Sequence, residues 1–135
     1  MPTVPKFDPA RRNSRVGPLK LPAEGRSGAA PAWPLPGRTT VAEREAWSEL
    51  WRTPQAVAWE QLGWTRTVAR YCRIMVASER KDAQPGLLAQ VTALEDRLGL
   101  TPKAMRLLLW EIAADEVAEQ RQAASGGVRQ RIKAV

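Results

Sequence analysis

The carboxylates best spaced for chemistry are Glu111, Asp115 and Glu119, which recur at every fourth residue. On a helix this spacing aligns them on one side, where their oxygens would suit a hard cation such as Mg²⁺ or Ca²⁺. A single helical row supplies few converging oxygens, and no loop shapes them around an ion. We therefore interpret the row as a solvated helix face and predict no metal site.

Histidine is absent from the sequence, and Cys72 is its only cysteine. This composition excludes a histidine-based catalytic triad, a histidine-ligated metal and an intrachain disulfide. No phosphate-cradling GxxxxGK followed by Ser or Thr occurs either. We expect no catalytic residue and no cofactor, which favours a binding protein over an enzyme. Cys72 lies on an apolar helical stripe and is predicted to be core.

The basic residues are concentrated at the two ends of the chain. Residues 1–40 carry seven basic and two acidic residues, residues 41–119 carry ten and twelve, and residues 120–135 carry four and none. Two basic ends around a slightly acidic body suit a polyanion such as nucleic acid, although they could also simply aid solubility. The predicted DNA-binding residues are Lys6, Arg11, Arg12, Arg15, Lys20, Arg26, Arg66, Arg70, Arg73, Arg129, Arg131 and Lys133.

Proline and glycine interrupt residues 1–38 so often that neither a helix nor a strand is expected to propagate there. We predict a basic, extended arm that stays outside the core, with Trp33 and Leu35 pinning its end onto the body. The chain start lacks the apolar block of a signal peptide, and no apolar run is long enough to cross a bilayer. We therefore expect an intracellular protein with no membrane partner.

Five helices are predicted between the arm and a short basic C-terminal tail, so the fold class is all-α. Thr40 and Glu43 form a capping-box pattern, Thr53 and Pro54 resemble a second helix start, and Gly63 can end that helix. The expected domains are an arm at 1–38, a helical core at 39–124 and a disordered basic tail at 125–135. The expected helices cover about 41–52, 54–62, 65–80, 87–98 and 102–124.

The last two helices are predicted to form a hairpin. Gly99 is predicted to end the first of these helices in the left-handed conformation. Thr101 is predicted to be the N-cap of the second helix, and Pro102 its first residue. The second helix would carry apolar residues on two opposite sides, and one face cannot offset the conformational entropy of ordering it. We therefore predict a closed homo-oligomer larger than a dimer. The expected inter-subunit residues are Leu107, Trp110, Ala114 and Val117.

A helix-turn-helix around Gly63 is an alternative. Leu62 and Trp64 suit that motif, whereas Trp59 is too large for the point where its helices cross. If the motif were present, Thr65, Arg66, Thr67 and Arg70 would face the major groove.

Several short sequence motifs together resemble those of small terminase subunits from phages and prophages of GC-rich bacteria. The resemblance covers about residues 11–120, and Met105 stands where members of that family often have arginine. The motifs that carry the resemblance are Ala32-Trp33-Pro34-Leu35-Pro36, Glu43-x-x-x-Trp47-x-x-Leu50-Trp51 and, most specifically, Leu98-Gly99-Leu100-Thr101-Pro102-x-Ala104.

The resemblance implies a mostly helical ring that binds double-stranded viral DNA in the host cell cytoplasm. It also implies regulation of the large terminase subunit, which carries the ATPase and nuclease. Two other functions stay open. One is a virion structural or adaptor protein whose tails contact DNA, and the other is a helix-turn-helix transcriptional regulator.

Overall fold

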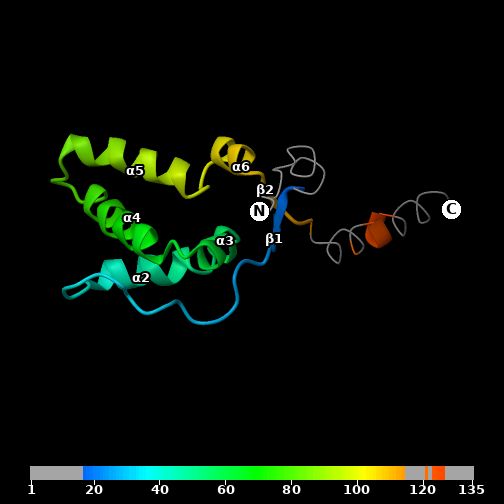
Figure 1. The fold of residues 1–135 in the computed structure, drawn as a ribbon, viewed down its shortest axis with the longest axis horizontal. Coiled ribbons are helices and arrows are strands. Elements are labelled where there is room, and N and C mark those ends of the chain that lie inside the picture. Colours follow the sequence, from blue (N-terminus) through cyan, green and yellow to red (C-terminus); the bar gives the residue numbers. More distant parts are fainter. Residues whose placement is uncertain (1–16, 115–120, 122, 127–135) are drawn as a thin grey trace, which may run out of the picture.

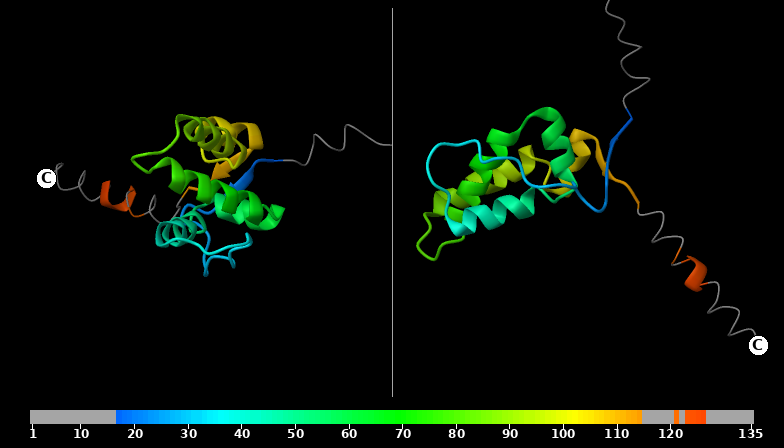
Figure 2. Two further views of the ribbon diagram at one scale, coloured as in Figure 1. Left: turned by 90° about the vertical axis from the view of Figure 1, so that its left-hand side faces the viewer. Right: turned by 90° about the horizontal axis from the view of Figure 1, so that it is seen from below.

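The computed structural model describes residues 17–114, residue 121 and residues 123–126. Its body consists of five helices and one two-stranded sheet, in which α4 lies between α2 and α5 (Figures 1 and 2). The mostly helical fold confirms the predicted class, and the short sheet corrects its all-α form. The elements are β1 (Leu19–Leu21), α2 (Val41–Leu50), α3 (Gln55–Leu62), α4 (Thr65–Ser78), α5 (Pro85–Arg97), α6 (Pro102–Leu108) and β2 (Trp110–Ile112).

The predicted capping box starts α2. The backbone N–H of Glu43 donates to Thr40 Oγ1 at 3.1 Å, and Glu43 Oε1 accepts from the backbone N–H of Thr40 at 3.4 Å. The second predicted cap does not form, because the Thr53 hydroxyl donates to the carbonyl of Leu50 at 2.7 Å instead. Pro54 is then the residue that precedes α3. Gly63 ends α3 in the left-handed conformation, as expected.

A row of tryptophans forms the centre of the core. The rings of Trp33, Trp47, Trp51 and Trp59 meet edge to face, with successive centroids 5.0, 5.4 and 5.8 Å apart. Trp47, Trp51 and Trp59 are buried and anchor the core. The indole N–H of Trp47 donates to the carbonyl of Pro31, and that of Trp59 to the carbonyl of Leu98, each at 2.8 Å. These two bonds join α2 to the incoming chain and α3 to the end of α5.

The expectation that residues 1–38 stay outside the core is wrong for the part of this segment that the structure describes. Leu21 is fully buried, and β1 pairs in parallel with β2. Burying one leucine contributes roughly 1.5–3 kcal/mol, which adds to the backbone pairing in holding this strand against the body. Trp33 and Leu35 are partly buried against the same core, which confirms the predicted pinning. Residues 1–16 lie outside the described part of the chain.

The predicted long fifth helix is wrong, because α6 ends at Leu108. Leu109 follows with a φ of 58°, and the chain continues as β2. This turn places Trp110 inside its own chain, where its ring lies 5.9 Å from that of Trp64 and it is 7% exposed. The left-handed leucine costs roughly 1–2 kcal/mol, which burial of the large indole can offset. Trp110 is therefore buried within its own chain, whereas the sequence had suggested that it faces a neighbouring subunit.

The turn between α5 and α6 has the predicted local structure. Gly99 has a φ of 73°, and the Thr101 hydroxyl accepts the backbone N–H of Ala104 at 3.1 Å. The same hydroxyl donates to Asp96 Oδ1 at 2.8 Å, which fixes the turn to the last part of α5.

Cys72 is fully buried, as predicted, on the side of α4 that faces the core. Its thiol donates to the carbonyl of Glu43 at 3.4 Å. Burial disfavours the thiolate and raises the pKa of Cys72 to about 11. The residue is therefore a structural thiol rather than a nucleophile.

Candidate nucleic-acid interface

The predicted DNA-binding residues separate into three groups in the structure. Two arginines are engaged within the body and three basic residues are exposed. Those engaged are Arg26 and Arg73, and those exposed are Lys20, Arg66 and Arg70. Those outside the described residues are Lys6, Arg11, Arg12, Arg15, Arg129, Arg131 and Lys133.

Arg26 fastens the N-terminal segment to α3. Its Nε donates to Glu60 Oε2 at 2.8 Å, and a second guanidinium N–H donates to the carbonyl of Ala29 at 3.0 Å. The guanidinium also lies 5.5 Å from the centre of the Trp51 ring. The hydrogen bond between Arg26 and Glu60 favours the charged form of both groups. It therefore lowers the pKa of Glu60 and raises the pKa of Arg26. A phosphate would have to compete with these contacts, so Arg26 is better described as a structural residue.

Arg73 has a similar role on α4. Its Nε lies 3.4 Å from Glu43 Oε2, and another N–H donates to the carbonyl of Pro36 at 3.4 Å. Its guanidinium stacks 5.3 Å from the centre of the Trp33 ring. The side chain thus ties α4 to the segment before α2.

Arg66 and Arg70 are the exposed basic residues of α4. They are one helical turn apart, so both side chains project from the same side of the helix. Arg70 donates to the Thr67 hydroxyl at 3.4 Å, a contact that leaves most of its guanidinium free. Neither arginine takes part in a salt bridge within the described residues, so both can meet a phosphate.

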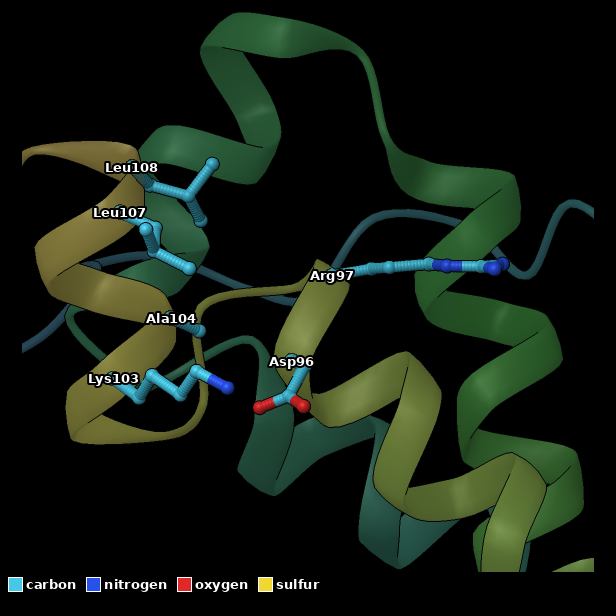
Figure 3. A pocket seen from close by; sticks show the side chains of 6 residues that line it. All are labelled: Asp96, Arg97, Lys103, Ala104, Leu107 and Leu108. Atoms are coloured by element: carbon cyan, nitrogen blue, oxygen red, sulfur yellow. The ribbon is translucent and has the colours of Figure 1, made fainter.

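A third arginine joins them from α5. Arg70 and Arg97 line the two sides of a groove of about 330 Å³, which we call the α4–α5 groove. The Arg97 side chain extends from the end of α5 toward α4 (Figure 3). The remaining lining is Ile74, Gln90, Ala93 and Leu94. Paired arginines above a partly apolar floor can hold a phosphate backbone while their stems pack against sugars.

Arg97 was not among the residues predicted from the sequence. A basic residue in the last turn of a helix has a local explanation, since it stabilises the negative end of the helix dipole. Only the packing of α5 on α4 brings Arg97 beside Arg70, and this proximity cannot be inferred from the spacing of the two residues in the sequence.

Acidic residues lie on the opposite side of α4. A second groove, of about 300 Å³ between α2 and α4, is lined by Glu45, Glu49 and Glu79 with Ala42, Ala46, Met75 and Val76. The helical period places Met75 and Glu79 opposite Arg66 and Arg70. The charge of α4 would therefore attract a polyanion to one face of the helix and repel it from the other.

Lys20 belongs to a different surface. It is exposed on β1 and lies opposite Glu111 of β2 in the strand register. The neighbouring carboxylate reduces its attraction for a phosphate, so we do not include it in the interface.

The metal prediction concerns the other end of the chain. Glu111 is exposed on β2, whereas Asp115 and Glu119 lie outside the described residues. Across residues 17–114, 121 and 123–126, no group of three His, Cys, Asp or Glu side chains could hold a metal ion. In the same part of the chain, no helix has the length and hydrophobicity to span a membrane.

Comparisons of the chain with protein-family models, curated proteins and solved structures found no match.

Proposed function

We propose that this chain is a small terminase subunit that binds double-stranded viral DNA and regulates the large terminase subunit during genome packaging. In this proposal it assembles into a homo-oligomeric ring in the host cell cytoplasm. The large subunit supplies the ATPase and nuclease, and this chain supplies DNA binding.

The observation that supports DNA binding most strongly is the position of Arg66, Arg70 and Arg97. All three come from a body whose charge is otherwise slightly acidic, and the α4–α5 groove brings two of them together. Arginine can donate two parallel, charge-assisted hydrogen bonds to one phosphate, which suits contact with a DNA backbone. The acidic α2–α4 groove supports the proposal further, because it disfavours DNA on the other side of α4.

The chain ends supply the remaining positive charge. Residues 1–16 carry Lys6, Arg11, Arg12 and Arg15, and the last residues carry Arg129, Arg131 and Lys133. We propose that the groove fixes the position of the duplex while the ends add contacts to neighbouring phosphates. Such contacts position a protein without reading bases, so sequence preference would come from α4 or from DNA bending around the assembly.

The experiment compares two duplexes of equal length and base composition. One carries the packaging start of the genome that encodes this chain, and the other carries the same bases in random order. The full-length protein is titrated with each at several salt concentrations, and its native mass is measured in parallel. We expect an oligomer that binds the packaging-start duplex more tightly.

Each result has a defined meaning. Equal affinity for both duplexes would favour a virion adaptor protein, and a dimer that prefers a palindromic site would favour a transcriptional regulator. Absence of binding at low salt would overturn the proposal. Stimulation of the large subunit's ATPase by the oligomer tests the regulatory part separately.

A further inference from the structure

A groove between α5 and α6 has an apolar floor that the described residues leave open (Figure 3). Its volume is about 380 Å³, and its floor consists of Ala104, Leu107 and Leu108. Leu107 is 76% exposed, and the helix that carries it has only seven residues. So short a helix has little intrinsic stability, and a leucine left in water contributes nothing to holding it. A partner that covers Leu107 would stabilise α6.

The rim of this α5–α6 groove is positively charged. Asp96, Arg97 and Lys103 line it, and Asp96 already accepts the hydrogen bond of the Thr101 hydroxyl. Neither Arg97 nor Lys103 takes part in a salt bridge within the described residues. The surface therefore suits an apolar segment that carries negative charge.

The sequence contains such a segment directly after β2. Ala114, Val117 and Ala118 would share one side of a helix, and Asp115 would border that side. Glu116 and Glu119 add two more negative charges, and no basic residue occurs between Glu111 and Arg121. Both the apolar pattern and the charge of residues 114–119 are complementary to the groove.

At the end of β2 the chain runs away from the α5–α6 groove (Figure 1). The backbone N–H of Ala113 donates to the carbonyl of Leu21 at 2.7 Å, so the chain still follows β1 at that residue. Figure 1 and the right-hand view of Figure 2 show residues 112–114 running away from α5 and α6. The segment is therefore better placed to reach the groove of a neighbouring copy.

We infer that the α5–α6 groove of one copy binds residues 114–119 of a second copy. This inference rests on the assembly part of the proposed function, and the two grooves share one residue, Arg97. The contact joins two different surfaces, so its repetition forms a closed ring or an open chain of subunits rather than an isolated dimer. Leu107 then lies on one side of the contact, with Ala114 and Val117 on the other.

Disulfide trapping tests the contact directly. Leu107→Cys and Val117→Cys are made in separate full-length proteins, and one is isotopically labelled so that mass identifies mixed dimers. After the two proteins are mixed and oxidised at neutral pH, we expect a Leu107→Cys to Val117→Cys crosslink. The native thiol at Cys72 is buried and will not compete.

Leu88→Cys is the matched control, because Leu88 is an exposed leucine of α5 that does not line the groove. We expect it to crosslink to Val117→Cys several-fold less. Equal yields would overturn the inference. So would a double Leu107→Cys, Val117→Cys chain that closes on itself at high dilution, because its own segment would then occupy the groove.

Native mass supplies a second measurement. Leu107→Glu and Lys103→Glu are expected to lower the oligomer mass, whereas Leu88→Glu and Lys81→Glu are not, with thermal melts to confirm that all four variants fold. A wild-type monomer would overturn both the inference and the assembly part of the proposed function. An unchanged oligomer in Leu107→Glu and Lys103→Glu would overturn the inference alone.

Discussion

The indole ring of Trp110 lies so close to Gly99 that a Cβ atom at position 99 would overlap its six-membered ring. The glycine closes α5 with a φ of 73°, and the tryptophan opens β2. One residue pair thus connects the turn before α6 with the strand after it. The short helix is held between them.

Replacing Gly99 with alanine is expected to destabilise the fold through two effects. The left-handed conformation disfavours alanine by roughly 1 kcal/mol, and the new methyl group displaces Trp110. Gly63→Ala is the matched control, because Gly63 ends a helix with a φ of 70° and has open space around its missing Cβ. Urea unfolding should show a clearly larger loss for Gly99→Ala, and equal losses would mean that Trp110 does not pack there in solution.

The α4–α5 groove can be tested through the salt dependence of DNA binding. Each phosphate contact contributes about −0.9 to the slope of log affinity against log salt, so Arg66→Ala, Arg70→Ala, Arg97→Ala should flatten the slope by roughly two to three units per engaged subunit. The exposed set Arg38→Ala, Arg52→Ala, Arg80→Ala removes the same charge elsewhere. If both triple variants flatten the slope equally, the protein binds DNA through net charge rather than through this groove.

Deletion of residues 1–16 is expected to leave the fold intact and weaken DNA binding. It removes Lys6, Arg11, Arg12 and Arg15, so the salt slope should flatten by roughly two to four units if most of them contact phosphates. Deletion of residues 1–32 should also lower the melting temperature, because it removes the buried Leu21 and the Arg26–Glu60 ion pair. An unchanged slope in the shorter deletion would show that the first sixteen residues do not bind DNA.

The pKa of Cys72 predicts a loss of stability in alkali. The pKa of the thiol is raised from 9.0 to about 11 in the folded chain, so its contribution is fully present below pH 9 and is lost as the pH rises toward 11. In that window the free energy of unfolding should fall by up to roughly 1.4 kcal/mol per pH unit from this group.

Cys72→Ala isolates this contribution from the raised pKa of Tyr71, which acts in the same direction. Urea unfolding is measured for both proteins at several pH values, and the wild-type curve should fall more steeply above pH 9. Parallel curves would show that the thiol is accessible to water in the native state.

Local features of this protein were determined by the sequence alone. The Thr40–Glu43 capping box, the Thr101 cap and the left-handed Gly63 and Gly99 all formed as predicted. Each depends on residues within about one helical turn, so the nearby sequence contains the whole cause. The burial of three tryptophans followed from their size and apolar spacing. The failure of Thr53 to cap α3 is the exception, because the carbonyl of Leu50 competed for its hydroxyl.

The tertiary structure decided which surface each residue occupies. The strands LKL and WEI are too short to show an alternating pattern, and each is a strand only because the other lies beside it. Arg26 forms an ion pair with Glu60, and Arg70 lines a groove together with Arg97. Both arrangements depend on contacts between segments far apart in the chain. Trp110 had the same apolar spacing whether it faced a neighbouring subunit or its own core. Only the space left beside Gly99, between α5 and β2, determined that it turns inward.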